Sequence, residues 1–201
     1  MISVLDAQLF PDQCIVLNTG KELIFPIFRN GSSSINHEAW PAISKEEIAQ
    51  AKEIIVFVRE PYERFLSGVT AYLEYHHELE ADTVIQLINQ HLFLDRHFCP
   101  QFYWLMNLQR YTDAHLKILD IKELSNYTKI HVNKMNSIKL NQFFKENQKL
   151  HFYLAMDKVL YWDLKGQTVP FSDVVYELKM QWPEVYREVI ERSKTLCSVL
   201  D

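Results

Sequence analysis

The feature that most limits the possible folds is a run of five apolar residues, Ile54–Val58, which reads IIVFV. Its β-branched and aromatic side chains favour a strand, and because successive side chains of a strand point to opposite faces, this strand must be buried on both faces. Such strands are typical of the centre of a parallel sheet that is covered by helices. Pro61 follows almost at once, and proline is favoured in the first turn of a helix, so a helix is predicted over residues 62–76.

The rest of the chain continues this alternation of short strands and helices. No internal repeat, low-complexity tract or flexible linker divides it, and 201 residues fit one ordinary domain. We therefore expect residues 1–201 to form a single α/β domain in which a mostly parallel central sheet is flanked by helices. The further strands are predicted at 14–17, 23–28 and 116–119, and the further helices at 81–93, 100–111, 139–150 and 174–197, the last interrupted near Pro183.

The composition narrows the class of function. The formal net charge is −5, whereas a general nucleic-acid-binding protein normally carries a basic surplus on one face, so nucleic acid is not an expected partner. The three cysteines lie far apart and predict neither a disulfide framework nor a zinc site. The first residues lack the pattern of a signal peptide, and no uncharged apolar run approaches the ~18 residues of a membrane span. We therefore expect a soluble cytoplasmic protein without a membrane partner.

A first candidate anion-binding segment follows the predicted strand 23–28. It reads Arg29-Asn-Gly-Ser-Ser-Ser34 and opens a predicted helix, so backbone N–H groups, hydroxyls and the positive end of a helix dipole could face an anion. Gly31 would let the backbone come close, and the Arg29 guanidinium could stabilise a leaving oxygen. A serine-rich loop with a helix cap is the alternative. The Walker A pattern of ATP- and GTP-hydrolysing proteins is absent, because no second glycine and no lysine follow.

A second candidate segment, Arg59–Ser67, is more specific. Arg59 ends the central strand and Ser67 lies about two turns into the next helix, so a guanidinium and a hydroxyl could converge on one phosphate. Arg64 is expected to serve a local ion pair instead. The alternative is an ordinary strand-to-helix corner in which Ser67 bonds back into its own helix.

The sequence VREPYERFLSGV around the second segment resembles the 3′-phosphate-binding motif of sulfotransferases that use 3′-phosphoadenosine-5′-phosphosulfate (PAPS), commonly Arg-Asp-Pro-Tyr-Glu-Arg-x-x-Ser in the carbohydrate-modifying branch. The first segment then falls where that family carries its 5′-phosphosulfate loop, Pro-Lys-Thr-Gly-(Gly/Ser/Thr)-Thr-Ser. Arg29 replaces the lysine of that loop, which is similar to the tyrosylprotein branch. The resemblance implies that PAPS and its product PAP are bound by Arg29, Asn30, Gly31, Ser32, Ser33, Ser34, Arg59 and Ser67.

Three weaker resemblances follow in the family's order. His97-Phe-Cys-Pro-Gln101 is similar to a His-Trp-x-Pro-Gln element, and Ile130-His-Val-Asn-Lys134 to a loop that approaches the nucleotide in relatives. Residues 151–160 resemble the closing Tyr-x-x-Asp-x-x-Leu segment. Together they imply a P-loop-like sulfotransferase fold. They also imply nucleotide contacts for Asn133 and Lys134, and substrate contacts for His97 and Gln101.

The activity that the resemblance implies is transfer of a sulfuryl group from PAPS to an acceptor hydroxyl, without a metal. The acceptor oxygen, the sulfur and the departing phosphate oxygen must be brought in line, and Arg29 would stabilise the departing oxygen. The acceptor must also lose a proton, which requires a base. His37, about one helical turn beyond Ser34, is the first candidate, and Glu38 is the nearest rival. The remaining candidates are Glu46, Glu47 and His76.

The acceptor and two other functions stay open. The resemblance implies a sugar hydroxyl, on a small molecule or a glycan, and four aromatic side chains could hold a sugar ring, although core packing is the commoner role of such residues. A nucleotide-binding module without catalysis is one alternative. A phosphoryl-transferring kinase is the other, and it lacks both the Lys-Ser/Thr pair and an obvious Mg²⁺-binding Asp after a strand. Relatives with a Golgi membrane anchor differ from this chain, so a bacterial or viral origin is expected. The four aromatic residues are Trp40, Tyr72, Tyr75 and Trp104.

Overall fold

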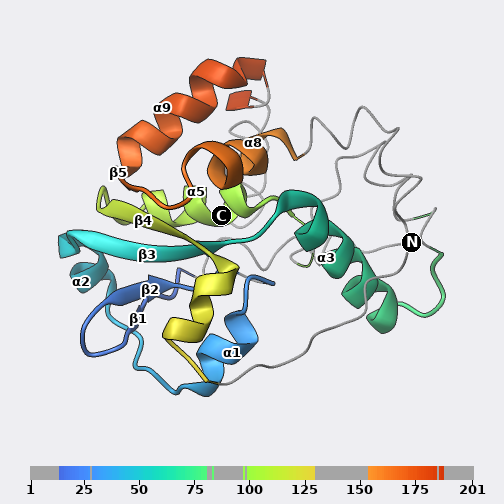
Figure 1. The fold of residues 1–201 in the computed structure, drawn as a ribbon, viewed down its shortest axis with the longest axis horizontal. Helices are drawn as coiled ribbons and strands as arrows, with labels where there is room; N and C mark the ends of the chain where they lie inside the picture. Colours follow the sequence, from blue (N-terminus) through green and yellow to red (C-terminus); the bar gives the residue numbers. More distant parts are fainter. Residues whose placement is uncertain are drawn as a thin grey trace, which may run out of the picture.

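The structure is a computed structural model that describes residues 14–27, 29–80, 83, 97, 99–129, 154–184 and 186–187. In this part of the chain a five-stranded sheet has the strand order β1-β2-β3-β4-β5 (Figure 1). The central pairs β2–β3 and β3–β4 are parallel, while β1 and β5 are antiparallel to their neighbours at the two edges. The predicted α/β class and the mostly parallel centre of the sheet are confirmed. The strands are β1 (Leu17–Asn18), β2 (Leu23–Phe25), β3 (Glu53–Val58), β4 (His115–Asp120) and β5 (Thr168–Pro170).

Helical segments connect the strands and cover both faces of the sheet. None of those in the described residues is long and apolar enough to cross a membrane. The π-helical turn η3 directly continues α8, and the 3₁₀ segment η2 directly follows β4. The helical segments are α1 (Ser32–His37), α2 (Lys45–Gln50), α3 (Pro61–Tyr75), α5 (Gln101–Gln109), η2 (Ile121–Asn126), α8 (Ala155–Lys158), η3 (Val159–Asp163) and α9 (Phe171–Gln181).

Strand β3 divides the core into two parts because its side chains alternate between the two faces of the sheet. Ile54, Val56 and Val58 belong to the larger apolar cluster, whereas Ile55 and Phe57 belong to the smaller one. All five side chains are at most 1% exposed. The prediction of a central strand that is buried on both faces is therefore confirmed.

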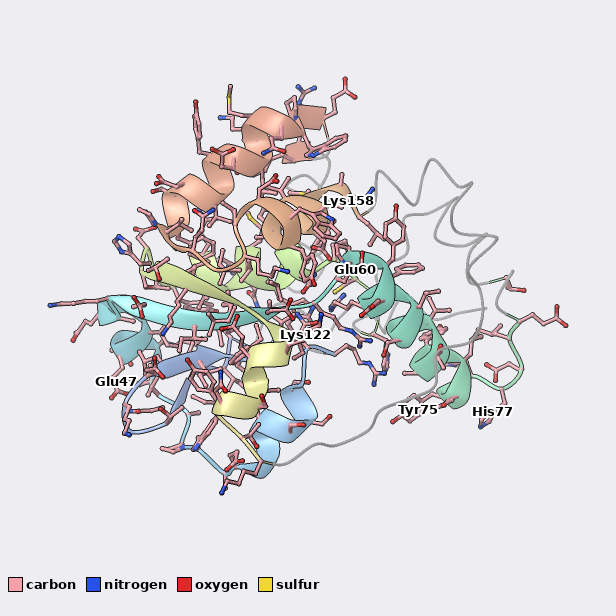
Figure 2. The ribbon with its side chains drawn as sticks, in the orientation of Figure 1. Glu47, Glu60, Tyr75, His77, Lys122 and Lys158 are labelled. Atoms are coloured by element: carbon pink, nitrogen blue, oxygen red, sulfur yellow. The ribbon has the colours of Figure 1, made fainter. Side chains whose placement is uncertain are left out.

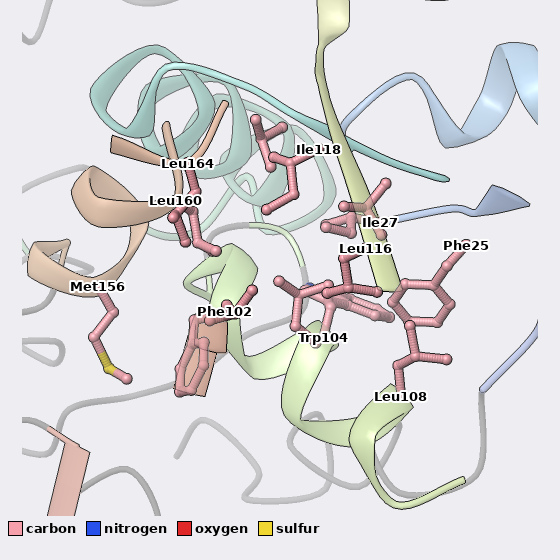
Figure 3. Close-up of a cluster of buried hydrophobic side chains, with 14 of the residues drawn as sticks. Phe25, Ile27, Phe102, Trp104, Leu108, Leu116, Ile118, Met156, Leu160 and Leu164 are labelled. Atoms are coloured by element: carbon pink, nitrogen blue, oxygen red, sulfur yellow. The ribbon is translucent and has the colours of Figure 1, made fainter. Parts of the chain in front are cut away.

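The larger cluster lies between the sheet and helices α3, α5, α8 and α9. Figure 3 shows side chains of α5, among them Phe102 and Leu108, together with Leu116 of β4 and with Leu160 from η3. The smaller cluster on the other face joins Ile35 of α1 to apolar residues of η2. Helix α1, which begins at Ser32 within the first candidate segment, is thereby packed against the sheet.

Most predicted elements of the described region are present, with changes at their ends. The strands predicted at 54–58 and 116–119 and the helices predicted at 62–76 and 100–111 are confirmed. The strand predicted over 23–28 is shorter, because Pro26 cannot donate a hydrogen bond to a sheet ladder. The strand predicted over 14–17 contributes only its last residue, Leu17, to β1.

The helix predicted at 174–197 is present with different ends, and two further predicted helices fall outside the described residues. Helix α9 begins at Phe171, three residues before the predicted start, and ends at Gln181 beside Pro183, where an interruption was predicted. The helices predicted at 81–93 and 139–150 lie outside the described residues, apart from Thr83.

Candidate anion-binding site

The candidate site lies at the edge of the sheet where the parallel strands β2, β3 and β4 end. Parallel strands that neighbour each other bring their carboxyl ends to one edge, which is where ligands bind in open α/β sheets. In Figure 2, Glu60 and Lys122 mark this edge, and Glu47 marks the opposite end of the sheet. Arg29 follows β2 and Arg59 follows β3, so both candidate segments begin here.

Arg29 joins the two segments directly. Its Nη2 donates hydrogen bonds to the Ser67 carbonyl oxygen at 3.0 Å and to Ser67 Oγ at 2.9 Å. The Arg29 backbone has a positive φ of 68°, a conformation that costs a non-glycine residue roughly 1–2 kcal/mol. The loop after β2 thus meets helix α3, 38 positions further along the chain, through a guanidinium and a hydroxyl.

Three guanidinium groups gather at this edge. Burial lowers the pKa of Arg29, and the positive charges of Arg59 and Arg64 lower it further. Burial also lowers the pKa of Arg59, again with a contribution from Arg64. Glu63 partly offsets this charge, since its Oε2 lies 3.9 Å from Arg59 Nε. Mutual repulsion among partly buried cations is relieved by a bound anion, so the edge is electrostatically suited to one.

Asn30 ties the loops together, in contrast to the expectation that it binds the nucleotide. The residue is fully buried, and its backbone N–H donates to the Ile27 carbonyl at 3.0 Å. Its Nδ2 donates to the Phe57 carbonyl at 2.8 Å and to Gln101 Oε1 at 2.6 Å. Its Oδ1 accepts from Arg64 Nε at 3.0 Å. These internal contacts occupy the side-chain amide and the backbone N–H of Asn30, and its contact with a nucleotide stays a prediction.

Gln101 is likewise internal, and its contact with a substrate stays a prediction. The side chain is fully buried and bonds to the backbone of Arg59, to Asn30 and to Asp157. His97, the other predicted substrate contact, is only 7% exposed and packs edge-on against the ring of Tyr72. Both residues are therefore buried in the structure.

Arg64 is not the surface residue that a local ion pair in its own helix would require. Its side chain is 1% exposed, and its described hydrogen bonds reach distant parts of the chain. Nε donates to Asn30 Oδ1, 34 positions away, and Nη1 donates to the Cys99 carbonyl, 35 positions away. Arg64 therefore belongs to the interior that supports the site.

The serines and the glycine of the first segment differ in exposure. Ser33 is exposed, whereas Ser32 and Ser34 are 8% and 4% exposed. Gly31 has a φ of +76°, and a Cβ atom there would collide with the side chain of Leu124 in η2. The glycine is thus required by the packing of the chain on itself. The sequence had suggested close approach to an anion as the reason.

The candidate bases are distributed over the whole molecule. His37 is the last residue of α1, and its side chain lies outside the described part of the structure. Glu38 Oε1 accepts a hydrogen bond from the Thr128 hydroxyl. Glu46 and Glu47 lie on α2, which leads into the opposite end of β3, so they are not at the edge that carries Arg29 and Arg59. His76 is the C-cap residue of α3, with Nδ1 3.4 Å from a Glu78 carboxylate oxygen.

Comparison with known proteins gives no further identification. A scan against protein-family models, a search of curated proteins and a search of solved structures find no match to this chain. What points to a function is therefore the arrangement of the side chains at this edge, together with the motifs that they belong to.

The remaining predicted contacts include both buried and undescribed residues. Asn133 and Lys134 lie outside the described residues. Tyr72 and Trp104 are 1% and 6% exposed and belong to the larger core cluster, so they do not present faces to a sugar. Tyr75 is 74% exposed, and Trp40 packs partly buried against the smaller cluster.

Asp157 is a central residue of the site whose contacts the sequence did not reveal. The carboxylate is fully buried and accepts hydrogen bonds from the backbone N–H groups of Gln101 and Phe102. Burial raises the pKa of Asp157, and Arg64 and the N–H donors oppose this rise. The available signal was an acidic residue inside an apolar stretch, because a charged side chain is rarely buried unless it is paired.

Replacing Gly31 by alanine is expected to lower the free energy of unfolding by about 2–3 kcal/mol. Roughly 1–2 kcal/mol comes from the positive φ and about 1 kcal/mol from displacing Leu124. Gly20→Ala is the matched control, because Gly20 has a similar φ of +87° with open space around it. Urea unfolding of both variants measures the difference. Equal losses for the two variants would show that Leu124 does not limit this position.

Proposed function

We propose that the chain binds PAPS at this edge of the sheet and transfers its sulfuryl group to an acceptor hydroxyl. The observation that carries the proposal is the direct contact between Arg29 and Ser67, with Arg59 at the end of the adjacent parallel strand. The two segments that resemble the phosphate-binding motifs of PAPS-dependent sulfotransferases therefore meet where one nucleotide could reach both. A P-loop-like sulfotransferase fold is part of this proposal, and the parallel strands β2, β3 and β4 support it.

The charges at the edge suit such a donor. PAPS carries a 3′-phosphate and a 5′-phosphosulfate, and guanidinium groups bind phosphate oxygens through strong charge-assisted hydrogen bonds. Arg29 and Arg59 are the proposed ligands, because Arg64 is turned inward to Asn30 and Cys99. Ser33, the exposed serine of the first segment, would add a hydroxyl.

The proposed reaction follows from positions and charges. The acceptor oxygen forms a bond to sulfur, the bond between sulfur and the 5′-phosphate oxygen breaks, and the acceptor proton passes to a base. Arg29 would stabilise the charge that develops on the departing oxygen, which requires its Nη2 to exchange Ser67 for the ligand. His37 is the proposed base, and a sugar hydroxyl is the proposed acceptor.

Two measurements test the proposal. Isothermal titration of the purified protein with PAP should show binding, and ATP, which lacks the 3′-phosphate, should bind clearly more weakly. Incubation with PAPS labelled in the sulfuryl group and a panel of sugar acceptors should then give a labelled product. A folded protein that binds neither PAP nor PAPS would refute the proposal.

Arg59→Ala is expected to weaken PAP binding by roughly 10- to 150-fold, because a hydrogen bond to a charged group contributes about 1.5–3 kcal/mol. Arg110→Ala is the matched control, because Arg110 is exposed and lies just beyond the far end of α5 from Gln101. The control removes the same charge and should leave PAP affinity nearly unchanged. Affinity of Arg59→Ala equal to that of the unaltered protein would remove Arg59 from the site.

A PAP-binding module without catalysis is the second candidate function. It is favoured by the contact in which Arg29 Nη2 donates to Ser67 Oγ, since two proposed ligand groups are then bonded to each other. Such a module would bind PAP with the same dependence on Arg59 but would give no labelled product from PAPS. The turnover assay therefore separates the two functions.

A kinase is less well supported. One observation nevertheless bears on the expectation that no obvious Mg²⁺-binding Asp follows a strand. Strand β4 ends at Asp120, opposite Val58, so an acidic residue does follow a strand at this edge. Its Oδ2 already accepts hydrogen bonds from Tyr161 and Lys165, both at 3.1 Å, and its Oδ1 accepts from the Lys122 backbone at 2.9 Å. Preference for ATP over PAP in the titrations would favour this function.

A further inference from the structure

The N-terminus of α5 is capped by a side chain from a distant part of the chain. The first N–H groups of a helix have no partner within it, and the N-cap residue, Pro100, makes no side-chain cap. Asp157 of α8 takes this place: Oδ2 accepts from the Gln101 N–H at 2.8 Å, and Oδ1 accepts from the Phe102 N–H at 3.0 Å. A carboxylate is also favoured there by the helix dipole. Asp157 therefore fixes where α5 begins.

Gln101, the first residue of α5, connects this capped helix end to the candidate site. The Gln101 carboxamide pairs with the backbone of Arg59, because Oε1 accepts from the Arg59 N–H at 2.8 Å and Nε2 donates to the Arg59 carbonyl at 2.9 Å. A neighbouring strand would make the same two bonds. The amide thus continues the hydrogen bonding of β3 by one residue, up to the residue that carries the guanidinium.

The same carboxamide also holds the other loop. Its Oε1 accepts a second hydrogen bond from Asn30 Nδ2 at 2.6 Å, and Nε2 donates a second one to Asp157 Oδ2 at 3.3 Å. Two donors and two acceptor positions are all that an amide group offers, so its orientation is fully determined. Asn30 is the neighbour of Arg29, and one side chain therefore anchors both arginine loops.

We propose that Asp157 and Gln101 are positioning residues, which set the relative placement of Arg29 and Arg59 through the Gln101 carboxamide without touching the ligand. The placement itself is independent of which anion binds. Only its effect on PAP affinity rests on the proposed function. The expected role is to keep the two cations arranged for one ligand before that ligand arrives.

Amide hydrogen exchange followed by NMR tests the chain of contacts without any ligand. In Asp157→Asn the side-chain NH₂ cannot accept one of the two backbone N–H groups, so Gln101 and Phe102 should exchange faster. The decisive amide is that of Arg59, which bonds to Gln101 and not to Asp157. We expect its protection to fall at least about tenfold, while that of Val56 within β3 changes less than about threefold.

A second variant and a control keep the test decisive. Gln101→Met removes the carboxamide at similar volume, so Arg59 should lose protection while Phe102, still bonded to Asp157, keeps it. Met156→Ala is the matched control, because Met156 is the buried neighbour of Asp157 in α8 and lies in the apolar core. In Met156→Ala the hydrogen-exchange protection of the Arg59 amide should not fall selectively. Full protection of Arg59 in both variants would overturn the proposal, as would failure of both to fold while the control folds.

Titration with PAP gives the functional readout. Asp157→Asn and Gln101→Met should bind PAP at least about tenfold more weakly at a temperature where circular dichroism shows them folded, since displaced ligand groups lose much of their effect. Met156→Ala should bind normally. If the unaltered protein does not bind PAP, the proposed function fails, while the exchange of Arg59 still decides the positioning role. Normal PAP affinity in folded variants would contradict that role.

Discussion

Arg64→Ala is expected to lower the free energy of unfolding by about 3–5 kcal/mol, because removing one member of a buried charged group leaves the others uncompensated. The Arg64 side chain is 1% exposed and donates to Asn30 and to the Cys99 carbonyl. Burial raises the pKa of the Asp157 carboxyl and the charge of Arg64 opposes this rise, so the loss of Arg64 removes part of what favours that carboxylate. For a chain of this length the loss corresponds to a fall in Tm of roughly 6–20 °C.

Thermal and urea unfolding measure this effect, and two variants define its origin. Arg64→Met keeps most of the apolar stem, so it separates the packing of the side chain from its charge and hydrogen bonds. Arg59→Ala removes a guanidinium that is 29% exposed, and its stability should change by only about 1 kcal/mol or less. A stability of Arg64→Ala within about 1 kcal/mol of the unaltered protein would show that the interior tolerates the loss.

His37→Ala is expected to reduce sulfuryl transfer at least about a hundredfold while PAP affinity stays nearly unchanged. A general base typically contributes 10²–10⁴-fold to a rate and adds little to binding of the donor, whereas a phosphate ligand affects both. The unprotonated imidazole is the active form, so transfer by the unaltered protein should fall as the pH drops below ~6.5, the ordinary pKa of histidine. Initial rates at saturating PAPS between about pH 5 and 8 measure this.

Glu38→Gln is the control for the base. The Glu38 carboxylate already accepts a hydrogen bond from the Thr128 hydroxyl, and an amide oxygen can accept the same bond. Transfer by Glu38→Gln should therefore persist. Loss of transfer in Glu38→Gln together with its retention in His37→Ala would make the carboxylate the base. Retention of transfer in both variants would place the base elsewhere, with His76 the next residue to test.

The elements that the sequence predicted well are those with a strong local signal. Ile54–Val58 is apolar on both faces and is followed by Pro61, and the structure has β3 and α3 there. Helix α2 was missed, although Ser44 and Glu47 form a capping box that marks its start. Helix α2 has only six residues and is stabilised mainly by its caps, so its sequence shows little apolar periodicity. Strand β5 was missed because three residues ending in Pro170 resemble a loop unless β4 is there to pair with them.

The candidate site was predicted as two segments, and what could not be predicted is which side chains face inward. Arg, Asn and Gln are as suitable for an internal hydrogen-bond network as for a phosphate ligand. Asn30 and Gln101 were assigned to ligands and are fully buried, while Arg29, in the same motif as Asn30, reaches across to Ser67. The direction of each side chain depends on packing between segments that are up to 71 positions apart, as for Asn30 and Gln101.

The separation of Asp157 from the two arginine loops also sets an order of events during synthesis. Both loops have left the ribosome's active centre once Ser67 has been added, yet Asp157 follows 90 positions later. At 5–20 residues per second this interval lasts roughly 5–20 s. Throughout it, α5 cannot have its cap, and the Gln101 carboxamide is without one of the groups that orient it. A nascent chain therefore carries both arginine loops before the hydrogen bonds of Asp157 to Gln101 can form, and the candidate site gains these bonds only when α8 has been made.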